Sequence, residues 1–205
     1  MSTSTGTSAA RPPHAIVLVR HAEKPPAEGL PQGVGQDGIA DPQELTVRGW
    51  QRAGALVALF DGTRAGPWGA GPAAHLLACR PERAHPSRRA VSTLVPLARR
   101  CGLEVDTGFR AGDEAALARH LRGLGGLVVV AWSHQYLPAL ARHLAADAAA
   151  VPPSWPAERF DLLWLLQPLQ PLPGPQGPGD GGYRFTPLPQ DLLGGDEAAP
   201  LTSPG

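Results

Sequence analysis

The chain has 205 residues and a formal net charge of zero at pH 7, with 18 basic and 18 acidic residues. This length suits one domain of the α/β kind with a sizeable core. The even charge balance gives no sign of nucleic acid or an anionic membrane surface as a partner. No apolar run approaches the roughly 20 residues of a membrane span.

The ends of the chain and the two cysteines further limit the class of protein. Cys79 and Cys101 form no CxxC pair and have no histidine at zinc-finger spacing, so we expect no zinc site. The first residues are small and polar, without the apolar core of a signal peptide, which favours a reduced, cytoplasmic setting. We expect residues 1–13 to be disordered, residues 14–190 to form a single domain and residues 191–205 to be a loose tail.

The first predicted element is a strand over residues 15–19, an apolar run rich in β-branched residues that is typical of burial on both faces. Arg20 and His21 follow it, where ligands bind in open α/β sheets. Burial of these two side chains costs free energy unless an anion compensates, which indicates a phosphate site. A polar strand end in which Arg20 pairs with Glu23 explains the same residues equally well.

Residues 25–42 form a long loop rich in proline and glycine, and a loop of this length can border a functional site. Thr46 is a suitable N-cap for a helix that runs to about residue 60. Residues 75–79 predict a second buried strand.

A polar turn then leads to a helix predicted over residues 88–100, with Ser87 as its N-cap and Gly102 as its stop. Arg88 and Arg89 would lie in the first turn of this helix. Positive side chains are unfavourable at a helix N-terminus unless an anion joins them, so this turn also indicates an anion site.

The second half of the chain continues the alternation of strands and helices. Residues 103–105 predict a weak strand, and a helix follows from Asp113 to about Gly123. Residues 127–132 predict the central strand, which ends in Ser133 and His134 and leads to a helix over residues 137–146.

Residues 160–166 and 183–187 predict two further strands, the second at an edge of the sheet, with a surface loop over residues 168–182 between them. The whole pattern predicts an α/β fold: a three-layer αβα sandwich around a mostly parallel central sheet.

Two predicted strands end in a histidine, His21 and His134. If these strands are neighbours, both imidazoles meet the guanidinium groups of Arg20 and Arg89. Guanidinium groups match phosphate oxygens bidentately, and a neutral histidine can attack phosphorus and hold the phosphoryl group covalently. The second histidine can stabilise the transferring oxygens. A histidine that merely caps a strand end is the plainer interpretation of His134.

Four motifs between residues 14 and 166 resemble, in order and spacing, those of the histidine phosphatase superfamily, which has the phosphoglycerate-mutase-like fold. They are Arg20-His21-Ala22-Glu23, Leu45-Thr46-Val47-Arg48-Gly49, Ser87-Arg88-Arg89-Ala90-Val91-Ser92-Thr93 and Val130-Ala131-Trp132-Ser133-His134. The later segment WPAERFD, residues 155–161, resembles a bacterial subgroup without a well-defined activity or assigned substrate.

This resemblance implies roles for four residues. His21 would be the nucleophile that becomes phosphohistidine, Arg20 and Arg89 would bind the phosphate, and His134 would complete the pocket. Arg89 fits the motif spacing better than Arg88 does. No metal or cofactor is implied, and the substrate would be a small-molecule or protein-borne phosphoryl group.

The proton donor departs from the family pattern, because many members place a glutamate inside a longer insert after the third strand. Here Glu104 precedes the expected position, and Asp113 and Glu114 open a helix. Asp113 is explained better as a plain N-cap, although either residue could protonate a leaving oxygen if it reaches the pocket. A weak or absent donor would favour substrates with good leaving groups.

Three functions fit these residues. The first is a metal-independent phosphatase, an enzyme that hydrolyses phosphomonoesters or phosphoproteins through phosphohistidine. The second is a phosphoglycerate-type mutase, which the short insert and the uncertain donor disfavour. The third is a phosphoryl-binding module of low turnover.

Overall fold

The computed structural model describes residues 13–169 and 182–199. It contains a six-stranded sheet with the order β3-β2-β4-β1-β5-β6. The strands are β1 (Pro13–Arg20), β2 (Ala73–Ala78), β3 (Val105–Asp106), β4 (Gly126–Trp132), β5 (Leu162–Pro168) and β6 (Tyr183–Pro189). The helices are α1 (Val47–Ala55), α2 (Val57–Phe60), α3 (Arg89–Cys101), α4 (Glu114–Arg122), α5 (Leu137–Leu144) and the 3-10 helix η1 (Ala148–Ala150).

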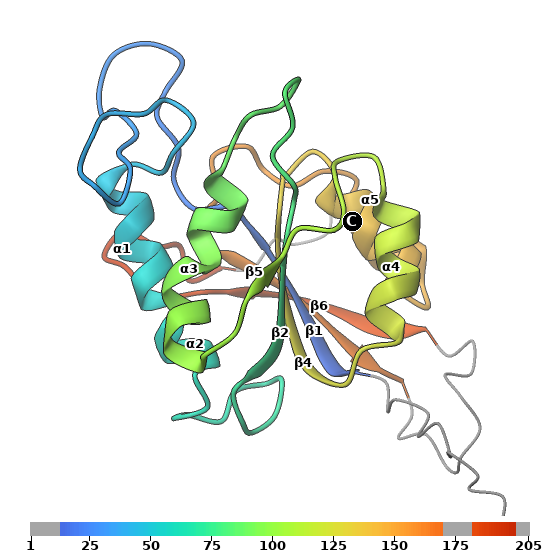
Figure 1. Ribbon diagram of the computed structural model, residues 1–205. Coiled ribbons are helices and arrows are strands. Elements are labelled where there is room, and N and C mark those ends of the chain that lie inside the picture. The colour runs from blue at the N-terminus through green and yellow to red at the C-terminus, as the bar shows by residue number, and fades with distance from the viewer. Residues whose placement is uncertain (1–12, 170–181, 200–205) are drawn as a thin grey trace, which may run out of the picture.

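The sheet is the middle of three layers. Strands β1, β2, β3 and β4 pair in parallel with one another, whereas β5 pairs in antiparallel fashion with both β1 and β6. Helices α1, α2 and α3 cover one face, and α4 and α5 cover the other (Figure 1). The predicted α/β class and the three-layer arrangement are confirmed. None of the helices in these two described stretches is long and apolar enough to cross a membrane.

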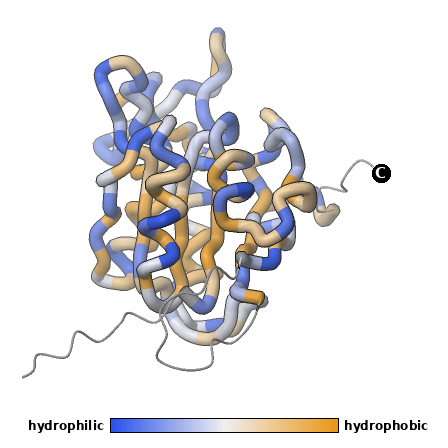
Figure 2. The backbone as a smooth tube through the Cα atoms, turned by 90° about the vertical axis from the view of Figure 1, so that its right-hand side faces the viewer, coloured by the Kyte–Doolittle hydropathy of each residue, from blue (hydrophilic) through white to orange (hydrophobic). Residues whose placement is uncertain are grey.

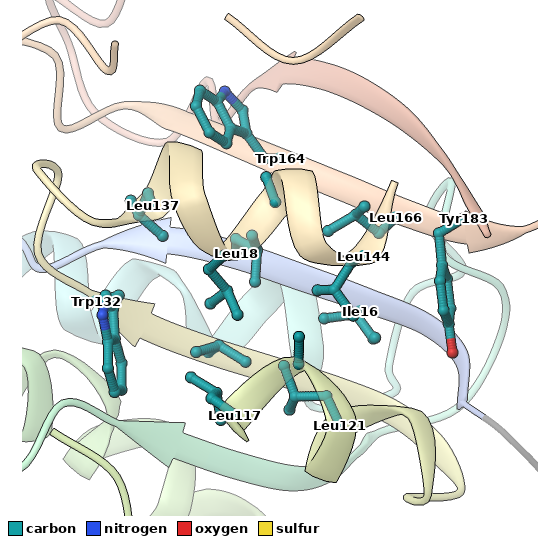
Figure 3. Close-up of a cluster of buried hydrophobic side chains, with 14 of the residues drawn as sticks. Ile16, Leu18, Leu117, Leu121, Trp132, Leu137, Leu144, Trp164, Leu166 and Tyr183 are labelled. Atoms are coloured by element: carbon teal, nitrogen blue, oxygen red, sulfur yellow. The ribbon is translucent and has the colours of Figure 1, made fainter. Parts of the chain in front are cut away.

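Strand β1 is buried on both faces, as its unbroken apolar run predicts. Ile16 and Leu18 lie in the cluster formed with α4 and α5 (Figure 3), whereas Ala15, Val17 and Val19 face the cluster on the α3 side. All five side chains are fully buried. Figure 2 shows the hydrophobic residues concentrated in the central part of the molecule, where the strands lie. The two clusters hold the sheet in place. The polar residues of the candidate site follow its strands at their carboxyl ends.

Two predicted strands begin later than expected. The weak strand predicted at residues 103–105 is β3 at Val105–Asp106. The strand predicted from Phe160 begins instead at Leu162, and Phe160 precedes it with its ring against a guanidinium group described below.

Two helix boundaries also differ from the predictions. The helix predicted from Thr46 to residue 60 is divided at Leu56 into α1 and α2. Ser87 does not cap α3: the N-cap position is Arg88, and the Ser87 hydroxyl accepts a hydrogen bond from Arg89 Nη1 (3.2 Å) instead. The capping prediction for Ser87 is therefore wrong.

Residues 191–199 are held more firmly than the loose tail that the sequence favours. Asp196 binds Arg52 of α1 through two hydrogen bonds, of 2.7 and 3.0 Å, and both side chains are nearly inaccessible. Burial by itself would raise the pKa of Asp196, but hydrogen bonds from Arg52 and from two backbone N–H groups hold the pKa well below its ordinary value. The tail thereby reaches α1, the helix that supports the candidate site.

We expect Asp196→Ala to lower the free energy of unfolding by about 3 kcal/mol, because it leaves the buried guanidinium of Arg52 with a partner missing. The exposed Glu28 offers a matched control, and Glu28→Ala should change stability by less than about 0.5 kcal/mol. Because the folded-state pKa of Asp196 is depressed, its contribution is present above the unfolded value of about 3.9 and is lost as the pH falls below it. Urea unfolding of both variants at several pH values tests this.

Candidate active site

The carboxyl ends of β1 and β4 lie side by side, because these strands pair in parallel with Arg20 opposite Trp132. The backbone N–H of His21 continues the pairing by donating to Trp132 O (3.1 Å). His134 follows two residues after Trp132, so both histidines belong to one edge of the sheet. The long loops after β1 and β2 rise at this edge (Figure 1). The predicted proximity of the two strand ends is confirmed.

Residues of the later motifs hold the loop that carries His21. The N–H of Ala22 donates to Thr93 Oγ1 (2.8 Å), and the N–H of Thr46 donates to Glu23 O (3.0 Å). Thr46 also caps α1, since its Oγ1 accepts from the N–H of Gly49 (3.1 Å). A Cβ atom at Gly49 would lie 2.5 Å from Glu23 O, so only glycine lets the helix approach the loop this closely. These motif residues therefore position the segment around His21.

His21 is 8% exposed, and its ring is fixed by a hydrogen bond between Nδ1 and Ala22 O (2.8 Å). The carbonyl can only accept, so Nδ1 carries the proton and the lone pair of Nε2 stays free. The pKa of His21 is lowered to about 3, mainly by burial and in part by the charges of Arg20 and Arg89, while the hydrogen bond to Ala22 opposes these effects. The imidazole is therefore neutral at physiological pH, as a nucleophile requires.

Nitrogen NMR of the free protein should show His21 as the neutral Nδ1–H tautomer throughout the range of about pH 5 to 8, over which an ordinary imidazole gains a proton. The reason is the burial of the ring together with its bond to Ala22 O. The exposed His143 supplies the comparison within the same spectra. Protonation of His21 in this range, or a proton on Nε2, would contradict the assigned tautomer.

Arg20 is 1% exposed and is held by the segment that precedes β5. Its Nη1 donates to Ala157 O and, at 3.4 Å, to Arg159 O. Its guanidinium carbon lies 3.8 Å from the centre of the Phe160 ring, a cation–π contact. Burial lowers the pKa of Arg20 to about 10, so the group is still charged at neutral pH.

Three nitrogens near His21 lack a hydrogen-bond partner within the described residues. They are Nε and Nη2 of Arg20 and Nδ1 of His134, and all three are buried. Leaving a buried polar group unpaired costs about 1–3 kcal/mol. Burial lowers the pKa of His134, and the charges of Arg20 and Lys24 act in the same direction. This combination of unpaired donors and positive charge suits an anion.

Arg89 and both histidines line one cavity of about 210 Å³, over the carboxyl edge of the sheet. Arg89 is held there by Pro42 O (2.5 Å) and Glu44 O (3.3 Å). Burial lowers its pKa against the opposing charges of Glu44 and Asp41. Arg20 does not line this cavity.

Two alternatives left open by the sequence are decided by the ion pairs. Glu23 does not pair with Arg20: its carboxylate binds Arg52 at 2.8 Å. Arg88 is half-exposed and pairs with Asp41 and Glu44, whereas its neighbour Arg89 lines the cavity. Of the two neighbouring arginines, the structure therefore places Arg89 at the cavity and Arg88 outside it.

The two predicted donors are not brought to the cavity. Glu114 is buried, and its Oε1 accepts from the indole Nε1 of Trp132 (3.0 Å) and from the N–H of Gly112 (3.0 Å). Asp113 occupies the N-cap position of α4, and its carboxylate accepts from the N–H of Arg110 (3.2 Å). Neither residue lines the cavity around His21. Both carboxylates therefore have structural partners, which the sequence alone does not show.

Other residues of the site escaped sequence reasoning. The loop between β2 and α3 turns at Glu82 and His85, whose backbones bond to each other, and both line the cavity. The WPAERFD segment supplies the contacts of Arg20, although Trp155 and Phe160 suggest simple core positions. For Glu82 and His85, the run of charged residues before Ser87 is the signal that the sequence offers.

Within residues 13–169 and 182–199, no cluster of three or more histidine, cysteine or acidic side chains could hold a metal ion.

No model of a known protein family matches the chain, and no curated protein sequence matches it. A solved structure described as "the putative phosphohistidine phosphatase SixA from Agrobacterium tumefaciens" matches over 85% of this chain and 96% of that chain, with 16% sequence identity and a TM-score of 0.46.

Proposed function

We propose that this chain is a phosphatase that hydrolyses phosphomonoesters through a phosphohistidine on His21. The observation that supports this best is the state of His21. Its ring is neutral and buried, and it is anchored through Nδ1 to Ala22 O (2.8 Å), so Nε2 is free to attack beside a 210 Å³ cavity. The unpaired N–H groups of Arg20 offer donors for phosphoryl oxygens.

In the first step, Nε2 of His21 attacks phosphorus and forms the N–P bond, while the ester P–O bond breaks and its electron pair leaves with the oxygen. The departing oxygen takes a proton from solvent or from an acid. The ring becomes a cation that still carries the Nδ1 proton, and Ala22 O stabilises this charge. Arg89 and Arg20 balance the charge on the phosphoryl oxygens.

In the second step, water attacks phosphorus and the N–P bond breaks, with its electron pair returning to Nε2. The water gives up a proton, inorganic phosphate leaves, and His21 is neutral again. His134 lies at the same edge and can hydrogen-bond the phosphoryl oxygens in both steps. A mutase would instead have to return the phosphoryl group to a bound acceptor before water reached it.

A low-turnover phosphoryl-binding module is the second candidate, because Asp113 and Glu114 are both engaged outside the cavity. It would use the same arginines and histidines as an anion cradle without an effective proton donor. Such a protein would bind phosphate or vanadate without releasing product from esters.

Phosphate release from p-nitrophenyl phosphate in the presence of a chelator tests the proposal. The nitrophenolate scarcely needs a proton donor, so the assay reports the nucleophile even if an acid is missing. Turnover that survives the chelator is the expected result. Binding of phosphate without any turnover would instead support the binding module.

Glu114→Gln should leave the ratio of phenyl phosphate to p-nitrophenyl phosphate hydrolysis within about twofold of wild type. The amide oxygen can still accept from Trp132 Nε1 and the N–H of Gly112, and the native carboxylate is held away from the cavity. Loss of a true proton donor would slow the ester with the poor leaving group by about 100-fold more than the other. Steady-state kinetics on both esters distinguishes these outcomes.

A further inference from the structure

A second and larger cavity, of about 590 Å³, opens beside the first. The two cavities share Lys24 and Arg89 as lining residues. The larger one lies within residues 24–42, mainly in the loop that follows the His21 segment. Through these shared residues, the larger cavity adjoins the cavity that His21 lines. Its volume falls in the range of about 300–1,000 Å³ that small-molecule sites occupy.

Hydrogen bonds hold part of the loop that forms the larger cavity in place. The N–H of Val34 donates to Leu45 O, the N–H of Asp41 donates to Gly33 O and the indole of Trp50 donates to Val34 O, each at 2.8 Å. A Cβ atom at Gly33 would lie 2.2 Å from Asp41 O, so the two arms of the loop meet more closely than any other residue would allow. The wall of the cavity that Gly33 and Asp41 supply is therefore fixed.

The chemistry of the walls is largely apolar with a cation at one end. Three ionisable side chains line the cavity: Lys24, Asp41 and Arg89. Asp41 is paired with Arg88, and Arg89 is bound to backbone carbonyls. Lys24, the single lysine of the chain, is exposed, and it forms no ion pair with any residue that the structure describes. Its ammonium group is thus left for a ligand at the boundary of the two cavities.

We propose that the loop of residues 25–42 and Lys24 form a leaving-group site for a small-molecule phosphomonoester that has an apolar carbon skeleton and a second anionic group. The skeleton fills the larger cavity, and Lys24 binds the second anion. This specificity rests on the proposed phosphatase function, but binding at the site can be measured without turnover. It favours a small molecule over a protein-borne phosphoryl group.

Calorimetry with two non-hydrolysable probes tests the site: naphthylmethyl phosphonate and a counterpart that carries a carboxylate on the distal ring. Wild type should bind the carboxylated probe about fivefold more tightly, and Lys24→Gln should abolish this preference. Lys24→Arg should restore most of it. Arg64→Gln removes one exposed positive charge at the far end of the sheet and should leave the preference unchanged.

Ala27→Trp adds bulk inside the larger cavity, so it should weaken both naphthyl probes at least fivefold while sparing inorganic phosphate. Equal affinity for the two probes in wild type and Lys24→Gln, or tighter binding of a phosphopeptide than of either probe, would overturn the proposal. Because the probes are phosphonates, absence of ester hydrolysis would count against the phosphatase and leave this measurement valid.

Discussion

His21→Gln should lower kcat for p-nitrophenyl phosphate by about 1,000-fold or more, because it removes the atom that bonds to phosphorus and leaves only direct attack by water. The ring is buried and its Nδ1 is held by Ala22 O, so Nε2 is the part of the side chain left for the ester. Glutamine keeps a polar side chain of similar length, and the backbone bond from His21 N to Trp132 O is retained.

His143→Gln is the matched control, since this histidine is exposed on α5 and lies outside the cavity. Its activity should stay within about twofold of wild type. Circular dichroism and thermal melting of both variants show whether the fold is retained. Full activity in a folded His21→Gln protein would contradict the assignment of the nucleophile.

Arg20→Gln should lower kcat/KM by about 30-fold to several thousand-fold, which corresponds to the 2–5 kcal/mol typical for removal of one partner from a buried charge pair. In the wild-type guanidinium, the buried nitrogens Nε and Nη2 have no hydrogen-bond acceptor among the described residues, and a bound phosphoryl group would supply one. In wild type, phosphate at 100 times its Kd should raise the free energy of unfolding by about 2.7 kcal/mol.

This stabilisation by phosphate should be largely lost in Arg20→Gln, which thermal unfolding at a series of phosphate concentrations measures. Arg88→Gln supplies the control, because Arg88 is half-exposed and pairs with carboxylates instead of lining the cavity. If phosphate stabilises Arg20→Gln as much as it stabilises wild type, the buried guanidinium has a structural role only.

The strands could be predicted from the sequence because their signals are local. The apolar run at residues 15–19 and the valines before Trp132 identify two buried strands, and charged residues placed directly after them mark the carboxyl edge. Thr46 and Gly49 were part of a recognisable motif, although only the structure shows that they hold Glu23 at the loop.

The remaining features depend on contacts between distant segments. The guanidinium of Arg20 is held by Ala157 O, which is 137 positions away in the sequence. No local sequence pattern predicts such a contact. From the sequence Glu114 is a candidate acid, whereas in the structure its Oε1 accepts a hydrogen bond from the indole of Trp132 (3.0 Å). Asp196 looked like part of a loose tail, yet it pairs with Arg52. Side-chain partners of this kind follow from packing and cannot be derived from spacing.

The most direct test of the phosphohistidine on His21 is to quench the protein with alkali during turnover of a phosphate ester and to analyse its peptides by mass spectrometry. We predict one phosphorylated peptide that contains His21, with a modification that is stable in alkali, is lost in acid and is absent from His21→Gln. Turnover without this peptide, or a phosphoryl group on another residue such as Ser133 or Cys79, would contradict the proposed function.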